Sequence, residues 1–172
     1  MRKTMLLVGL VVVLGCSAYA QDSPSVEIFG GASLFHADGA PAGRSLFGGW
    51  QASFLKNLDP SFGFKADFGG QYRNIFGVRA SAHEFLFGPQ FTFRGNRNTG
   101  FVHFLTGAET ASYGGITNTA FAFGFGGGLD MKLGSQVAFR AVQFDYIPNR
   151  FRGIWTHDIR LGVGLVWKLG RS

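Results

Sequence analysis

Histidines and their polar neighbours are the residues of this chain best suited to acid–base chemistry. His157 and Asp158 are adjacent, and with a serine they would make a set that hydrolyses acyl chains. Ser112 and Ser45 are the conceivable serines, but an ordinary loop histidine is the simpler explanation. Neither His103 nor any other histidine has a spacing typical of metal ligands. We therefore predict no catalytic residue, no metal and no cofactor.

Local sequence argues against two further classes of ligand. The run Gly124–Gly128 has the composition of a nucleotide-binding loop, but it lies inside an alternating pattern and no helix follows it. The formal net charge is only +6, it includes Arg2 and Lys3, and Lys and Arg form no run. Nucleotides and nucleic acid are therefore not expected partners.

Polar residues and glycines alternate with apolar residues, many of them phenylalanines, in several segments. In 62–72, Phe64 and Phe68 alternate with Lys65 and Asp67, so one face is apolar and the other polar, as a β-strand requires. The composition agrees, because 27 glycines and 20 phenylalanines with 15% charged residues suit neither helices nor disorder. The pattern occurs in eight segments: 26–35, 46–56, 62–72, 83–94, 101–111, 121–133, 137–146 and 159–169.

The connections between these segments alternate in length. Those at 58–61, 95–100 and 134–135 are short, and those at 36–45, 73–82, 112–119 and 147–156 are longer. Membrane barrels with an up-and-down topology have short periplasmic turns and longer external loops. We predict an all-β fold, an eight-stranded antiparallel up-and-down transmembrane β-barrel with both termini on the periplasmic side.

Two strands are expected to be irregular. Gln143 and Asp145 come out of phase with Arg140, which predicts a bulge. Pro89 lies on the apolar face of its strand, where it cannot donate a ladder hydrogen bond. Because a closed barrel has no free edge, we expect a second bulge at Gly88–Pro89, with a break of the strand there as the alternative.

The volume of the barrel indicates which face is inside. An eight-stranded barrel is just wide enough to be filled by side chains. The glycine-rich polar face fits that space, whereas the phenylalanines would overfill it at ~1–3 kcal/mol per misfit. We expect the phenylalanines to meet hydrocarbon, unlike in a lipocalin-like soluble barrel, and charges of both signs to pair inside. The predicted lumen charge network is Glu27, Lys65, Asp67, Glu84, Asp130, Lys132, Arg140 and Arg160.

Arginines dominate the expected external loops. Guanidinium groups pair bidentately with phosphate, so lipopolysaccharide is a candidate partner, and plain solvated loop charge is the alternative. The candidate contacts are Arg44, Arg73, Arg79, Arg150 and Arg152, against the single acid Asp38. Six aromatic residues at or near strand ends are expected to form interfacial girdles: Trp50, Tyr72, Tyr113, Tyr146, Trp155 and Trp167.

The first twenty residues form a separate segment. A positively charged start precedes an apolar run too short to span a membrane, and Ala18–Ala20 has the small-x-small pattern of a cleavage site. We predict a signal peptide at 1–20 that is removed and a barrel domain at 21–172. The surroundings of Cys16 weakly resemble a lipoprotein processing site, but simple cleavage after Ala20 is favoured.

Three stretches carry a family resemblance: 26–31 (VEIFGG), 49–53 (GWQAS) and 160–167 (RLGVGLVW). They resemble the OmpA/OmpX-like outer-membrane barrels, over the whole mature chain. The resemblance implies a barrel in the cell outer membrane that the barrel-insertion machinery assembles, with Trp167 as the nearest candidate for its aromatic signal. Members serve as structural anchors, adhesins, surface-recognition proteins or small pores, and a few barrels of this size modify lipids.

We therefore expect a monomeric outer-membrane barrel, not an enzyme, with a structural or surface-interaction role. A small low-conductance pore is the alternative function, and a lipid-modifying enzyme is the third hypothesis. The expected partners are outer-membrane lipid and lipopolysaccharide.

Overall fold

The computed structural model describes residues 24–38, 45–151 and 153–170, which form eight β-strands. None of these residues belongs to a helix long and apolar enough to cross a bilayer. The predicted signal peptide at 1–20, with Cys16, lies outside the described residues. The strands are β1 (Val26–Ala37), β2 (Ser45–Asn57), β3 (Phe62–Ile75), β4 (Val78–Arg94), β5 (Asn98–Tyr113), β6 (Ile116–Lys132), β7 (Val137–Phe151) and β8 (Ile154–Leu169).

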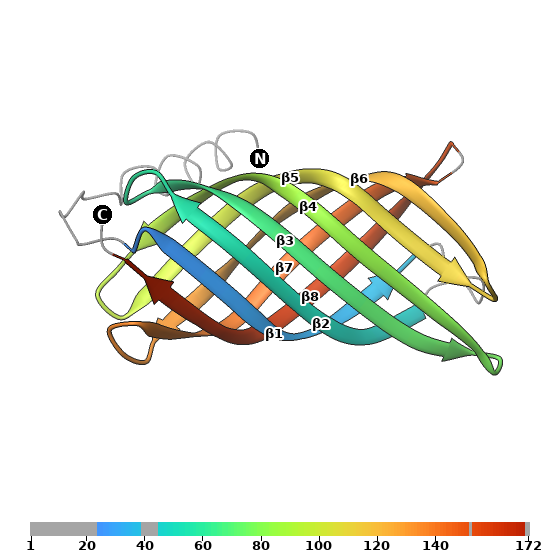
Figure 1. The fold of residues 1–172 in the computed structure, drawn as a ribbon, viewed down its shortest axis with the longest axis horizontal. Helices are drawn as coiled ribbons and strands as arrows, with labels where there is room; N and C mark the ends of the chain where they lie inside the picture. The colour runs from blue at the N-terminus through green and yellow to red at the C-terminus, as the bar shows by residue number, and fades with distance from the viewer. Residues whose placement is uncertain (1–23, 39–44, 152, 171–172) are drawn as a thin grey trace, which may run out of the picture.

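The strands close into one barrel, in which each strand pairs with its sequence neighbours and β8 pairs with β1. The closing register runs from Val26 opposite Leu169 to His36 opposite Ile159, so it uses almost the whole of β1. In Figure 1 the start of β1 and the end of β8 lie at the same end of the barrel as the β2–β3, β4–β5 and β6–β7 connections. The predicted eight-stranded up-and-down barrel is confirmed.

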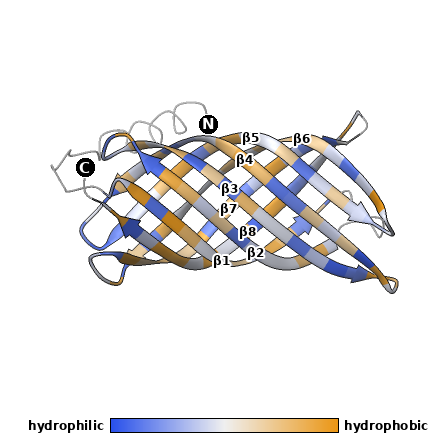
Figure 2. Ribbon diagram, in the orientation of Figure 1, coloured by the Kyte–Doolittle hydropathy of each residue, from blue (hydrophilic) through white to orange (hydrophobic). Residues whose placement is uncertain are grey.

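Side chains alternate between the two sides of the wall, and Figure 2 shows the resulting alternation of hydropathy along the strands. On β3, Phe64 is 54% exposed on the outside, whereas Lys65 and Asp67 are 2% and 0% exposed inside. Phe87 and Phe121 also lie on the outer surface. The phenylalanine-rich face is therefore the outer wall, and the predicted sidedness is confirmed.

We call the end of the barrel that holds both termini the periplasmic end and the opposite end the external end, after the predicted orientation. The external connections are shorter than predicted. Phe76 and Gly77 join β3 to β4 at φ values of 50° and 79°, and Gly114 and Gly115 join β5 to β6 at 57° and 84°. Two consecutive residues at positive φ make the tight turn whose twist matches that of paired strands, so pairing continues to the hairpin tips. β7 and β8 likewise pair up to their joined ends. Three of the predicted long loops are therefore wrong, because most of 73–82, 112–119 and 147–156 is strand.

These tight hairpins lengthen the wall beyond the ~11 residues per strand that spanning requires. β4 and β6 each contain 17 residues. At ~3.3 Å per residue and a tilt of ~40°, such a strand covers ~43 Å along the barrel axis, compared with an apolar band of ~25 Å in membrane barrels. The strand ends at the external side therefore extend well past the hydrocarbon.

β7 contains the predicted bulge. Its register with β6 shifts between Leu129 and Asp130, and its register with β8 shifts between Arg140 and Gln143. The extra residue restores the inward phase, so that Gln143 and Asp145 are buried in the bore together with Arg140.

The bulge expected at Gly88–Pro89 does not form. Phe64 lies opposite Pro89 in an unbroken register with β3. Pairing with β5 lapses at Gly88 and Pro89 and resumes in the same register at Gln90 opposite His103. The prediction was wrong because a missing N–H requires only a local loss of pairing, not an added residue.

Candidate functional site

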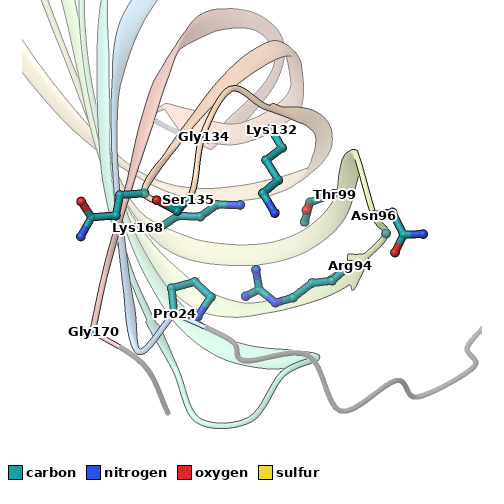
Figure 3. A pocket seen from close by; sticks show the side chains of 11 residues that line it. Pro24, Arg94, Asn96, Thr99, Lys132, Gly134, Ser135, Lys168 and Gly170 are labelled. Atoms are coloured by element: carbon teal, nitrogen blue, oxygen red, sulfur yellow. The ribbon is translucent and has the colours of Figure 1, made fainter.

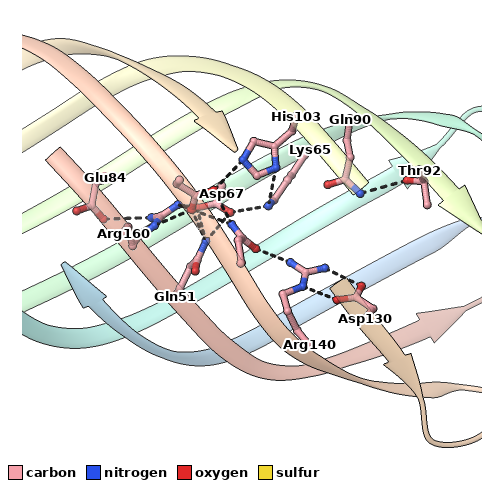
Figure 4. A network of polar contacts seen from close by, with 12 residues as sticks. Gln51, Lys65, Asp67, Glu84, Gln90, Thr92, His103, Asp130, Arg140 and Arg160 are labelled. Carbon is pink, nitrogen blue, oxygen red and sulfur yellow. Dashed lines mark hydrogen bonds and ion pairs between the residues drawn. The ribbon is translucent and has the colours of Figure 1, made fainter. Parts of the chain in front are cut away.

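Arg160 on β8 lies at the centre of a cluster of buried acids in the bore (Figure 4). Its Nη2 atom is 2.6 Å from Asp67 Oδ1 on β3 and 2.7 Å from Asp145 Oδ2 on β7. Its Nη1 atom is 3.4 Å from Glu84 Oε2 on β4. None of these four side chains is more than 2% exposed. One guanidinium therefore connects strands from opposite parts of the barrel through charge-assisted hydrogen bonds.

A second cation pairs with one of these acids, Asp67, and reaches Asp145 through a histidine. Lys65 Nζ is 2.9 Å from Asp67 Oδ2 and 3.5 Å from His103 Nδ1. His103 Nε2 is 2.9 Å from Asp145 Oδ1. A neutral imidazole with its proton on Nε2 satisfies both contacts, because Lys65 can then donate to Nδ1 while Nε2–H donates to the carboxylate. This tautomer closes a ring of contacts through the two aspartates.

Two amides occupy the remaining acceptor positions of these aspartates. Gln51 Nε2 donates to both oxygens of Asp67, at 3.1 and 3.0 Å. Gln143 Nε2 donates to both oxygens of Asp145, at 3.2 and 2.9 Å. A buried carboxylate is tolerated only with full hydrogen bonding and a nearby cation, and these two aspartates have both.

Glycines make room for this cluster. A Cβ at Gly69 would collide with Glu84 and lie 2.8 Å from Arg160 Nη1. A Cβ at Gly126 would collide with Asp145 and lie 2.7 Å from His103 Nε2. The inward glycines therefore provide the space in which the long polar side chains meet.

Arg140 forms a second layer, nearer the periplasmic end. Its Nε and Nη2 atoms donate to the two oxygens of Asp130, at 2.7 and 3.0 Å, and Nη1 donates to Gln143 Oε1 at 2.6 Å. The guanidinium lies between two rings, 4.3 Å from the centroid of Phe29 and 4.2 Å from that of Phe101. Stacking on both faces and hydrogen bonding at the edge fix its position.

The external half of the bore is packed with apolar side chains, which sequence reasoning missed. Phe35 and Phe47 meet edge to face with centroids 6.4 Å apart. Both lie at inward positions by strand parity, and that parity is the signal that could have found them. The apolar cluster comprises Phe35, Phe47, Ile75, Ala80, Ala82, Leu86, Leu105, Ala122 and Ile147.

A further polar group lies in this external half. Asn149 Nδ2 donates to Glu109 Oε2 at 2.8 Å and to Asp158 Oδ2 at 2.6 Å. The backbone N–H of Asp38 donates to the other oxygen of Asp158 at 2.7 Å. Thr156 Oγ1 also donates to Asn149 Oδ1. Glu109 and Asp158 are therefore held by amide donors, whereas Glu84 is paired with Arg160.

The predicted charge network is divided among three places. The structure brings Lys65, Asp67, Glu84 and Arg160 together, and pairs Asp130 with Arg140. Glu27 instead lies at the periplasmic mouth, where Arg94 Nη2 is 2.8 Å from its Oε1 atom. Lys132 is exposed there and forms no ion pair with any described residue. The central partners missing from the prediction are Gln51, His103, Gln143 and Asp145.

Two solved structures share this architecture. Neisserial surface protein A (NspA) matches with a TM-score of 0.72 at 11% sequence identity, covering 87% of this chain and 100% of that one. The N-terminal β-barrel domain of Pseudomonas aeruginosa OprF matches with 0.54 at 14% identity, covering 83% and 98%. This is the fold of the OmpA/OmpX-like outer-membrane barrels. No protein-family model and no curated sequence matches the chain.

The barrel separates the residues of the conceivable hydrolase set. His157 and Asp158 are consecutive on β8, so Asp158 points into the bore while His157 contacts Tyr146 on the outside. Ser112 bonds Thr117 at 2.8 Å on a different hairpin. Among the described residues, no serine forms a hydrogen bond with His157 or Asp158, so the geometry gives this alternative no support.

Two of the predicted external arginines lie on the outer wall of the barrel. Arg79 lies 5.5 Å from the ring centroid of Tyr72 near the start of β4. Arg150 lies 6.0 Å from the ring of Trp155 near the end of β7. Each guanidinium is exposed and held beside an aromatic face.

The other three arginines of that set differ in position. Arg73 is exposed at the external end of β3, where Nη1 donates to the carbonyl of Leu46 at 2.8 Å. It is therefore on a strand and partly engaged by β2, not free in a loop. Arg44 and Arg152 lie outside the described residues.

A belt of polar side chains, which we name the polar collar, separates these arginines from the phenylalanines of the outer wall. Its members bond in pairs across strands, at 3.2 Å for Tyr72–His83 and 3.1 Å for Thr110–Thr119. Tyr113 does not join it, because it packs inward against the apolar cluster, and Trp50 lies well inside β2, so the girdle prediction is wrong for both. The polar collar comprises Tyr72, His83, Thr110, Ser112, Thr117, Thr119, Tyr146 and His157.

Proposed function

We propose that this chain is a non-conducting barrel of the outer membrane, with a structural or surface-interaction role. The filled bore is the observation that carries the proposal. The predicted signal peptide would direct export, and the barrel-insertion machinery would assemble the chain as a monomer. The OmpA/OmpX-like fold supports the outer-membrane location.

Two barriers in series argue against passage of ions. An ion would first have to separate Arg160 from Asp67 and Asp145, which leaves buried charges unpaired at about 3–5 kcal/mol per broken pair. It would then have to enter the apolar cluster around Leu86 and Leu105, both 0% exposed, without its hydration shell. The small-pore alternative would require both layers to rearrange.

Conductance measurements test this proposal. Protein whose folding is verified by heat-modifiable gel mobility should show no steady conductance after insertion into a planar bilayer, because the bore is filled at two levels. Discrete open channels whose ion selectivity changes in Arg140→Gln or Arg160→Gln would contradict the proposal and support the pore.

We further propose that the external wall contacts lipopolysaccharide through Arg79 and Arg150. Both guanidiniums face outward, beyond the hydrocarbon-facing phenylalanines and next to the polar collar. Guanidinium binds phosphate bidentately, and the aromatic partners Tyr72 and Trp155 hold each group in place before it binds. Hydroxyl and imidazole groups of the collar are suited to sugar and headgroup oxygens.

The double variant Arg79→Gln/Arg150→Gln should bind lipopolysaccharide about three- to tenfold more weakly, because each exposed ion pair contributes up to about 1 kcal/mol. Binding is measured by titrating lipopolysaccharide into the barrel in phosphatidylcholine nanodiscs. Arg97→Gln is the matched control, since Arg97 is exposed in the β4–β5 turn at the opposite end. Equal affinity of the double variant and the wild type would reject this contact.

A further inference from the structure

The periplasmic end of the bore opens into a cavity that the function proposed above does not use. The cavity has a volume of about 510 Å³. Three cationic side chains reach into it from separate strands, Arg94 from β4, Lys132 from β6 and Lys168 from β8 (Figure 3). Thr99 and Ser135 add hydroxyl groups to its lining. We name this cavity the periplasmic vestibule.

The charge of the vestibule is not balanced by its own acids. Glu27 accepts from Arg94 at 2.8 Å and from Asn57 Nδ2 at 3.1 Å. Asp130 is held by both nitrogen donors of Arg140. Neither Lys132 nor Lys168 forms an ion pair with any residue that the structure describes. Two ammonium groups therefore face the same cavity, and Glu27 and Asp130, each already bonded to an arginine, attract Lys168 only from beyond ion-pair distance.

The vestibule is a blind pocket rather than the entrance of a channel. Two residues deeper into the bore, Phe101 lies beyond Thr99 on β5, and Asp130 lies beyond Lys132 on β6. Phe101 and Phe29 enclose the guanidinium of Arg140, which is bonded to Asp130. This stacked layer forms a floor, so a solute that enters from the periplasm stops there.

We propose that the periplasmic vestibule binds a soluble anion that carries a phosphate ester. The two ammonium groups supply the unpaired charge, while the guanidinium of Arg94, already paired with Glu27, and the hydroxyls of Thr99 and Ser135 supply further donors. The cavity volume is within the range of small-molecule sites, about 300–1,000 Å³. The lysines lie on the inward face of their strands and point away from lipid, which favours a solute over a phospholipid headgroup.

Calorimetric titration of the folded barrel with glycerol 3-phosphate tests the site. The wild type should bind one equivalent saturably, and Lys132→Gln/Lys168→Gln should bind at least about tenfold more weakly, because each lost charge-assisted contact weakens binding severalfold. Lys56→Gln is the matched control, because Lys56 is exposed on the outer wall near the end of β2, at the same end of the barrel as the vestibule. This variant should bind like the wild type. All three proteins must show heat-modifiable mobility.

Two results would overturn the site: the absence of saturable binding, and equal affinities of the double variant and the wild type. Equal weakening by Lys56→Gln would also do so, because binding would then reflect general surface charge. The source of the phosphate is resolved by repeating the titration in nanodiscs at physiological ionic strength, where the Debye length is about 8 Å. Equal affinity in phosphatidylcholine and phosphatidylglycerol discs supports a soluble ligand, whereas loss of binding only in phosphatidylglycerol overturns it in favour of lipid headgroups.

Discussion

Replacing Arg160 by glutamine should lower the free energy of unfolding by about 3–5 kcal/mol, the cost of leaving buried charges without their partner. Arg160 is 0% exposed and pairs with Asp67, Asp145 and Glu84. Glutamine keeps some hydrogen-bonding capacity but removes the charge that the three acids share. Lys65 then remains as the cation beside Asp67, while Glu84 keeps no cationic partner among the described residues. The change is measured by urea unfolding of the barrel in phospholipid vesicles.

A matched control and a rescue variant separate this electrostatic effect from general disruption. Arg79→Gln removes an exposed arginine from the outer wall and should change the unfolding free energy by less than about 0.5 kcal/mol. Adding Asp145→Asn to Arg160→Gln removes one of the unpaired acids and should recover part of the loss. If Arg160→Gln unfolds like the wild type, water must reach the cluster and the bore is not closed.

The wall of this barrel was predictable because it depends on a local rule. Strand parity places Phe64 and Lys65 on opposite faces whatever the rest of the chain does. The volume of an eight-stranded bore then decides which face is inside. These two arguments fix the sidedness without any knowledge of distant contacts, and the number of alternating segments gives the strand count.

The turns were predicted less well. The two-residue turn signals were present in the sequence, but the long polar stretches around them were interpreted as loops. Phe76–Gly77 and Gly114–Gly115 are two-residue turns at positive φ. A glycine pair or an X–Gly pair between alternating segments favours such hairpins. The strand ends that flank each turn have polar side chains on the outer wall, as expected for residues past the hydrocarbon. This polarity made them resemble loops.

The bore was predicted in kind but not in detail, because its contacts join strands that are distant in the sequence. Nothing local to Arg160 indicates that Asp67, 93 residues away, accepts from it at 2.6 Å. Asp145 was missed for a different reason, since the β7 bulge changes its phase. Sequence parity showed only which residues share the interior, and the tilt of the strands decides which of them meet.

Apolar packing inside the barrel modifies the expectation of a lumen lined by glycines and ions. Phe35 and Phe47 occupy inward positions in the external half, and the smaller Ala80 and Ala122 lie in the same cluster. Large and small inward side chains thus complement each other where charges are few. The bore behaves as an ordinary protein core at one end and as an ion-pair cluster at its centre, and both arrangements exclude water.

Phe87→Arg should cost about 2–4 kcal/mol of unfolding free energy in vesicles, the penalty for arginine facing the middle of a bilayer. Phe87 is near the centre of β4, is 49% exposed on the outer wall and contacts Phe68 with ring centroids 5.9 Å apart. The substitution replaces an aromatic ring in hydrocarbon with a charge that cannot reach either interface without stretching. Urea unfolding and heat-modifiable mobility provide the measurements.

Phe76→Arg is the matched control for Phe87→Arg. Phe76 is 87% exposed at the tip of the β3–β4 turn, beyond the hydrocarbon, so an arginine there should change stability by less than about 0.5 kcal/mol. Both variants replace an exposed phenylalanine with the same charge, and the main difference between the two sites is their depth along the barrel axis. A membrane barrel requires a clear difference between them, whereas a barrel whose outer wall faces water would tolerate both equally.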